Sequence, residues 1–158
     1  MIAVAPIKKK APIILSNKFP ANNPEAGKET HFREKINSGE KIHTIRGNIK
    51  WWLEKAEKIN SGEMALHLRS WTGQPYNSKQ EEWAVYGKIG IQQITMMYSQ
   101  EDGEYIALID EKRVPIEEIA KNDGLTVEQF ENWFFNSKHD PFFQDFYGVI
   151  IHFTDFRY

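Results

Sequence analysis

Residues 36–46 read Ile-Asn-Ser-Gly-Glu-Lys-Ile-His-Thr-Ile-Arg, and the rest of the fold is predicted outward from this stretch. Phe32 and Ile36 lie four residues apart, the spacing of one helix face, and Asn37-Ser38-Gly39 is typical of a helix that ends on glycine. Residues 42–46 then alternate between two faces with the period of a strand. The stretch therefore predicts a short helix, a glycine turn and a strand in succession.

Hydrophobic alternation and turn residues predict further strands on both sides of this stretch. Five are expected, of which the third is long or bent: residues 13–19, 64–71, 83–97, 105–109 and 147–153. Helical spacing predicts a helix over residues 51–59, and Pro115 and Thr126 can each begin a short one. Gln129 follows Thr126 by three residues and can complete a capping box. The expected fold class is α+β, a small, partly closed β-barrel decorated with short helices.

The domain organisation follows from length and composition. The chain has 158 residues, which suits one domain, and with Cys 0 it has no disulfide framework or thiolate nucleophile. Residues 1–11 are predicted to be a flexible basic arm, because three consecutive lysines lie there between Pro6 and Pro12. A single domain is expected over residues 12–158.

Charge is distributed unevenly along the chain. Residues 1–80 hold 14 Lys and Arg against 7 Asp and Glu, whereas residues 81–158 hold 6 against 15. A basic half suits a phosphate-bearing partner, unless folding interleaves the two halves. The apolar runs are too short for a membrane span and no signal peptide is recognised, so we expect a cytoplasmic protein without membrane contact.

The motif with the most chemical content begins where the first predicted helix ends. Gly39, Lys41, Thr44 and Arg46 fit the pattern G-x-K-x-x-T-x-R, which resembles the signature of the ASCH domain, a branch of the PUA-like superfamily. Two later segments are also similar to elements of that family: residues 119–130 and 150–153. The resemblance implies a PUA-like fold with a ligand cleft on the barrel.

The resemblance also implies a hydrolytic alternative. In some small ASCH proteins the matching lysine and threonine, with a later acidic residue, are implicated in hydrolysing the amide of an acetylated cytidine. These roles would fall here on Lys41 as base, Thr44 as nucleophile and Asp123 as the orienting acid. The resemblance implies a glutamate at the last of these positions, whereas this chain has Asp123, whose side chain is one methylene shorter. Asn122-Asp123-Gly124 is equally typical of a turn without chemistry.

Physical chemistry sets two conditions for such a site. Lys41 and Thr44 are three residues apart, so in a regular strand they would lie on opposite faces, and they can cooperate only if the chain turns between them. A threonine hydroxyl needs a base, and lysine serves as one only when burial or a nearby cation such as Arg46 lowers its pKa. The alternative without catalytic function is an amphipathic barrel strand that has Thr44 and Arg46 on one face.

The loop over residues 69–80 is the second candidate feature. Its Gly, Pro and Asn residues favour turns, and it carries Trp71 and Tyr76 near Arg69 and Lys79. Aromatic rings beside cations suit base stacking combined with phosphate contact. The alternative is a loop folded over the barrel mouth with both rings packed inside.

Other site chemistries have little support in the sequence. The five histidines form no pair at metal-ligand spacing, and no glycine-rich phosphate loop or G-x-S-x-G motif is present. We therefore expect no metal and no cofactor. His43 adjoins Thr44 but is expected to point to the other side of the strand and to be structural.

The sequence therefore predicts a cleft that binds RNA or a nucleobase-containing ligand such as a modified nucleoside. Its floor and rim are assigned to six residues: Lys41, Thr44, Arg46, Arg69, Trp71 and Tyr76. Lys41 and Arg46 would meet phosphate or carbonyl oxygens, Thr44 would hydrogen-bond the base, and Trp71 or Tyr76 would stack on it. The alternatives are an amidohydrolase acting on N4-acylated cytidine or a related small amide, and an accessory protein with an unused pocket. The ligand's identity and the oligomeric state stay open.

Overall fold

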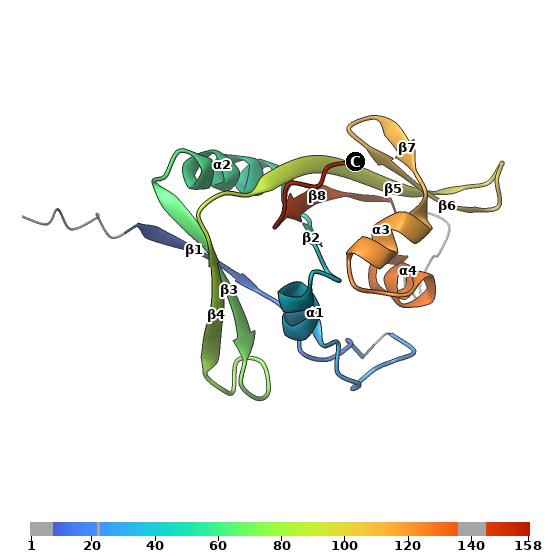
Figure 1. The fold of residues 1–158 in the computed structure, drawn as a ribbon. Coiled ribbons are helices and arrows are strands. Elements are labelled where there is room, and N and C mark those ends of the chain that lie inside the picture. Colours follow the sequence, from blue (N-terminus) through green and yellow to red (C-terminus); the bar gives the residue numbers. More distant parts are fainter. Residues whose placement is uncertain (1–7, 22, 136–144) are drawn as a thin grey trace, which may run out of the picture.

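The computed structural model describes residues 8–21, 23–135 and 145–158. Within these ranges the chain forms eight strands in two sheets and four helices (Figure 1). The predicted α+β class is therefore confirmed, and no closed barrel is detected in the described part of the chain. None of the helices within it is both long and apolar enough to cross a membrane.

Four short helices flank the sheets. They are α1 (Phe32–Ser38), α2 (Ile49–Asn60), α3 (Ile116–Asn122) and α4 (Val127–Phe135). Gly39 ends α1 in the left-handed conformation, with φ 81°, and its N–H donates to the Ile36 carbonyl, so the predicted glycine end is confirmed. The predicted capping box is confirmed as well, because the backbone N–H groups of Thr126 and Gln129 donate to each other's side chains at 3.0 and 3.2 Å.

The smaller sheet has three strands in the order β1-β3-β4. They are β1 (Lys9–Ile14), β3 (Met64–Trp71) and β4 (Gln80–Tyr86). β1 runs parallel to β3, and β4 runs antiparallel to it. Ala11 and Ile13 of β1 and Leu66 and Leu68 of β3 are buried, so this sheet contributes one side of the core.

The first strand begins earlier than the sequence predicted. Residues 9–11, which the sequence analysis assigned to the basic arm, belong to β1 and pair with residues 64–66 of β3. The strand also ends at Ile14 rather than continuing to residue 19. Pairing with β3 sets these limits, and a distant partner leaves no mark in the local pattern. Residues 1–7 of the predicted arm lie outside the described residues.

The larger sheet has five strands in the order β2-β8-β5-β6-β7, and all neighbours are antiparallel. They are β2 (His43–Arg46), β8 (Phe146–His152), β5 (Gly90–Ser99), β6 (Glu104–Ile109) and β7 (Lys112–Val114). The sequence analysis missed β7, whose three residues are too few to show an alternating pattern. β2 forms one edge of this sheet, which leaves its outer side open to contacts from the helices.

The prediction of one long strand over residues 83–97 is wrong. This segment contributes to both β4 and β5, and residues 87–89 carry the chain from the smaller sheet to the larger one. At this crossing the side chain of Asn60 donates to the Ile89 carbonyl at 3.0 Å and accepts the Ile89 N–H at 2.9 Å. The Asn60 amide thus supplies the two backbone hydrogen bonds that a neighbouring strand would otherwise provide to Ile89.

One cluster of buried apolar residues joins the two sheets. It includes Leu66 of β3, Ile59 of α2, Ile94 of β5, Phe130 of α4 and Ile150 of β8. In Figure 1, α3 and α4 lie side by side next to the larger sheet, and α2 lies where the two sheets meet. This packing fixes β2 and the turn between α3 and α4, the two elements that carry the candidate site.

Candidate functional site

Two backbone hydrogen bonds position the residues just before β2. The Lys41 N–H donates to the Lys35 carbonyl of α1 at 3.0 Å, and the Ile42 N–H donates to the Asn122 carbonyl of α3 at 2.9 Å. Lys41 therefore precedes β2 instead of belonging to it, and Thr44 lies inside the strand. The turn lies at residues 39–40, before Lys41, and the two backbone contacts bring Lys41 beside Asp123.

Lys41 and Asp123 form a buried ion pair. The Lys41 Nζ lies 2.7 Å from Asp123 Oδ1 and donates a second hydrogen bond to the Asp123 carbonyl at 2.8 Å. Only 2% and 6% of the two side chains are exposed. Lys35 Nζ donates to the neighbouring Gly124 carbonyl at 2.7 Å, so two ammonium groups hold the turn between α3 and α4.

The surroundings shift both ionisations. Burial lowers the pKa of the Lys41 amine and outweighs the attraction of Asp123, and the charges of Arg46 and Lys35 lower it further. Burial alone would raise the pKa of the Asp123 carboxyl, but the charge of Lys41 and the contact with His43 outweigh burial, so this pKa is lowered. Asp123 is therefore a carboxylate at neutral pH, and Lys41 releases its proton more readily than an exposed lysine.

A chain of close polar contacts continues from Asp123 to Tyr158. His43 Nδ1 lies 3.3 Å from Asp123 Oδ1, and His43 Nε2 lies 2.7 Å from the Tyr158 hydroxyl. Asn122 Nδ2 donates to that hydroxyl oxygen at 3.0 Å, which leaves the phenol proton for donation to His43 Nε2. His43 Nδ1 is buried without a hydrogen-bond partner among the described residues, so its 3.3 Å approach to Asp123 Oδ1 is a close polar contact.

The sequence analysis missed part of this chain. It gave His43 a structural role, correctly on the face opposite Thr44, and it did not single out Tyr158. The two residues are 115 positions apart, so no local pattern links them. One feature of the sequence could have indicated the contact between His43 and Asp123. His43 follows Lys41 by two residues, and residues two apart in an extended chain point to the same side, where they can contact a common partner.

A cavity of about 240 Å³, here called the inner cavity, opens beside the ion pair. Four residues singled out from the sequence line it: Lys41, Thr44, Arg46 and Asp123. Phe32, Leu125 and Trp133 contribute apolar walls. The structure thus brings these four residues to one hollow.

The Thr44 hydroxyl makes no hydrogen bond to the described residues. The Lys41 amine is bonded to Asp123 and not to Thr44. Thr44 is only 5% exposed, yet it lines the inner cavity. Its hydroxyl can therefore donate to, and accept from, a group bound there.

A larger cavity of about 1090 Å³, here called the outer cleft, adjoins the inner cavity. Ser16, Phe32 and Arg46 line both. Trp71 and Tyr76 line the outer cleft, with ring centres 5.2 Å apart and planes inclined at 49°. Tyr76 is 88% exposed and has a left-handed backbone with φ 66°. The two rings are therefore not packed inside a closed barrel mouth.

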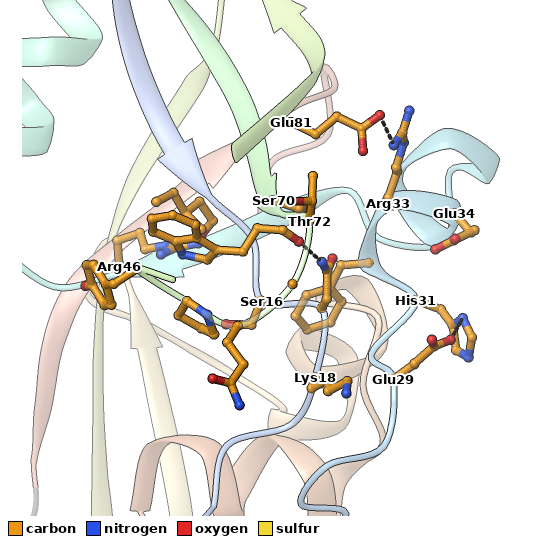
Figure 2. Close-up of a pocket in the computed structure, with 18 residues that line it drawn as sticks. Ser16, Lys18, Glu29, His31, Arg33, Glu34, Arg46, Ser70, Thr72 and Glu81 are labelled. Carbon is orange, nitrogen blue, oxygen red and sulfur yellow. Dashed lines mark hydrogen bonds and ion pairs between the residues drawn. The ribbon is translucent and has the colours of Figure 1, made fainter. Parts of the chain in front are cut away.

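The outer cleft carries both signs of charge. Its lining includes three glutamates and three cations: Glu29, Glu34, Glu81, Lys18, Arg33 and Arg46. Figure 2 shows the glutamates near Arg33 and His31, with Arg46 on the opposite side of the cleft. Arg33 pairs with Glu81 at 3.3 Å. Arg46 is thus separated from the acidic side chains of the cleft.

Arg69, which the sequence analysis assigned to the rim, does not line the outer cleft. Its Nε lies 3.3 Å from Glu82 Oε2, and His67 Nδ1 lies 2.9 Å from the same carboxylate. The register of β3 and β4 shifts between Leu68 and Arg69, which sets Arg69 opposite Glu82. The cross-strand carboxylate directs this side chain away from the cleft, and the sequence pattern could not reveal that pairing.

The side chains around the inner cavity supply an amine, a carboxylate, a hydroxyl and a guanidinium. Such a set can bind a polar ligand and can also carry acid–base and nucleophilic chemistry. In the described part of the chain, no three or more His, Asp or Glu side chains gather as they would to hold a metal ion.

Comparison of the chain with protein-family models, with curated proteins and with solved structures finds no match. The functional assignment therefore depends on the geometry described above and on the motif between Gly39 and Arg46.

Proposed function

We propose that the chain is a PUA-like domain of the ASCH type that binds RNA or a nucleobase-containing ligand. The observation that carries the proposal is the junction of two cavities at Arg46. The outer cleft offers Trp71 and Tyr76 for stacking, and the inner cavity offers Thr44 and the Lys41–Asp123 pair for hydrogen bonds. A ligand with a flat ring and polar substituents is complementary to both.

The aromatic pair supports a planar ligand. Tyr76 is almost fully exposed and lies within ring contact of Trp71, so the free protein leaves a large apolar surface at the cleft. Stacking of one base on an aromatic side chain contributes about 1–3 kcal/mol. A base bound beside these rings would cover that surface.

The charges favour a short ligand over a long RNA. Long single strands are held mainly by rows of cations that neutralise successive phosphates. In the outer cleft the number of glutamates equals the number of lysines and arginines, and Arg33 is already paired with Glu81. A nucleoside, a nucleotide or the end of an RNA strand fits this balance better than an extended strand.

Titration calorimetry with the four ribonucleosides, their 5′-monophosphates and short single-stranded RNA tests the proposal. Trp71→Ala is expected to weaken binding about tenfold because one stacking partner is lost. Trp51→Ala serves as the matched control, since Trp51 is 39% exposed on α2 and does not line either cavity. Absence of binding at millimolar concentration, or equal effects of the two variants, would overturn the proposal.

The inner cavity favours amide hydrolysis as a second candidate function. Thr44, whose hydroxyl has no hydrogen-bond partner among the described residues, lines the same cavity as a lysine whose pKa burial lowers. In this reaction Thr44 Oγ1 forms a bond to the amide carbonyl carbon and the neutral Lys41 amine takes its proton. Lys41 returns that proton to the nitrogen as the C–N bond breaks, and water then hydrolyses the ester. Asp123 holds the lysine through both steps.

Incubation with N4-acetylcytidine separates binding from catalysis. Release of cytidine and acetate that is lost in Thr44→Val would support hydrolysis, because valine preserves the shape of the side chain but lacks the nucleophile. Thr44→Ser keeps a hydroxyl and is expected to retain part of the rate. If acetylcytidine binds but no product forms at high protein concentration, the chain is a binding domain alone.

A further inference from the structure

Arg46 carries a positive charge with no ion-pair partner among the described residues, although the Asp123 carboxylate lies near enough to attract it. One of its terminal nitrogens, Nη2, donates to the Ile14 carbonyl at 2.7 Å, whereas Nε is buried without a hydrogen-bond partner among the described residues. A guanidinium has five N–H donors and stays charged in proteins. Donors therefore remain for a ligand at the junction of the two cavities.

No described carboxylate forms an ion pair with Arg46. Asp123, the acidic residue of the inner cavity, is bonded to Lys41 at 2.7 Å and contacts His43 at 3.3 Å. In the outer cleft the glutamates lie on the other side, as Figure 2 shows, and Glu81 is taken by Arg33. Arg46, Lys41 and Lys35 together place three cations near one carboxylate.

We infer that Arg46 binds a phosphate group and that the ligand of the two cavities is a nucleotide rather than a neutral nucleoside. The inference rests on the proposed function. Arg46 is half-buried and its Nε is fully buried, so leaving this cation without a counter-ion is costly, and an anion placed against it lowers that cost. The planar guanidinium matches two phosphate oxygens, and such charge-assisted bonds are stronger than bonds to a neutral carbonyl. The structure therefore favours phosphate over the carbonyl oxygen that the sequence left open.

The position of Arg46 between the two cavities also determines which part of the ligand lies near which residues. Trp71 and Tyr76 belong to the outer cleft only, and Thr44 and Lys41 belong to the inner cavity only. A phosphate at Arg46 would lie between these two sets of residues. The base then stacks on the aromatic side of the junction, or enters the inner cavity, while the phosphate stays in place.

Calorimetry on pairs of nucleoside and 5′-monophosphate tests the inference. For at least one base, the wild-type protein is expected to bind the monophosphate at least about tenfold more tightly than the nucleoside, since charge-assisted bonds are added. Arg46→Gln is expected to reduce this ratio to less than about threefold. Arg69→Gln is the matched control, because Arg69 is a half-buried arginine paired with Glu82 outside both cavities, and it should leave the ratio unchanged.

Two further measurements keep the test decisive if Arg46→Gln fails to fold. Inorganic phosphate at millimolar concentration should weaken binding of the monophosphate, but not of the nucleoside, to the wild-type protein. Arg46→Lys keeps the charge without the planar fork and is expected to preserve part of the preference.

The outcomes separate the inference from the proposed function. Equal affinity for nucleoside and monophosphate would overturn the inference and leave the proposed function standing. A preference for the monophosphate that persists in Arg46→Gln would also overturn the inference. If neither compound binds, the proposed function and the inference fail together.

Discussion

Lys41 and Asp123 face each other almost without contact to water. Removing one member of such a pair leaves the other charge buried, which typically costs about 3–5 kcal/mol, whereas an exposed pair contributes about 1 kcal/mol or less. We expect Asp123→Asn to lower the free energy of unfolding by about 3 kcal/mol or more in urea denaturation at pH 7. Asp102→Asn, which removes the exposed partner of Arg113, should change it by less than about 1 kcal/mol. Similar losses in the two variants would contradict a buried ion pair.

His152 makes the protein sensitive to acid. Its Nε2 lies 2.9 Å from Gln92 Oε1, and its Nδ1 is buried with no partner among the described residues, so an added proton finds no acceptor. Burial first, then the charges of His43 and Arg157, lower the pKa of this ring to about 3 from 6.5. Below pH 6.5 the unfolded chain takes up a proton that the folded chain refuses, so stability falls as the pH drops toward about 3.

Urea denaturation at pH 7 and pH 4.5 measures this effect. One proton contributes at most about 1.4 kcal/mol per pH unit inside that window. His152→Gln is expected to lose less stability between the two pH values than the wild-type protein does. His31→Gln, at a side chain that is 56% exposed, should keep the wild-type difference. An unchanged pH dependence in His152→Gln would show that other groups cause the acid sensitivity.

The turn between α3 and α4 favours glycine at position 124. Gly124 has φ +76°, and an added Cβ would lie 3.1 Å from Lys41 Cβ and 3.2 Å from Lys35 Cδ. Gly103 has a similar φ of +67° with nothing within 4 Å, so Gly103→Ala isolates the backbone strain, about 1–2 kcal/mol. Gly124→Ala is expected to cost about 1–3 kcal/mol more by thermal or urea unfolding, because the added methyl crowds both lysines. Equal costs would mean that the lysines move aside freely.

Helix ends were the most predictable elements. The glycine end of α1 and the capping box of α4 depend on residues within four positions of each other, and both are confirmed. Strand boundaries depend on partners far along the chain. The division of residues 83–97 between two sheets, the early start of β1 and the short β7 therefore escaped the local pattern.

The sequence predicted those residues of the candidate site that belong to the motif between Gly39 and Arg46, or that the resemblance to the family adds to it. Lys41, Thr44 and Arg46 come from one turn and strand, and the motif resemblance added Asp123 from 82 residues away. Arg69 was misplaced and Tyr158 was missed because cross-strand pairing and long-range packing decide where those side chains lie. The phosphate preference proposed for Arg46 could not be chosen from the sequence, since the proposal depends on which carboxylates already have partners.

For the whole molecule, folding interleaves the basic and the acidic half of the chain. β4 comes from the acidic half and lies beside β3 from the basic half. Its two glutamates lie within ion-pair distance of cations of the basic half: Lys10, Arg33 and Arg69. The excess of positive charge that the sequence shows over residues 1–80 is therefore partly cancelled on the folded surface.

This cancellation predicts a weak salt dependence of RNA binding. Each phosphate neutralised on a single strand adds about −0.7 to the slope of log K against log salt concentration. We expect a slope no steeper than about −1.5 for a short single-stranded RNA, which corresponds to about one or two phosphate contacts. Fluorescence anisotropy between about 50 and 300 mM KCl measures this slope. The double variant Glu81→Gln and Glu82→Gln should bind RNA more tightly and with a steeper slope. A wild-type slope of about −3 or steeper would show an extended phosphate track.

The crossing between the two sheets depends on a single amide, that of Asn60. Its nitrogen and its oxygen serve different backbone groups of Ile89, so the two ends of the side chain are not interchangeable. Deamidation would put a second oxygen, with negative charge, against the Ile89 carbonyl and turn an attraction into a repulsion. Chemical ageing at this one position would thus weaken the link between the two sheets without changing any residue that lines either cavity.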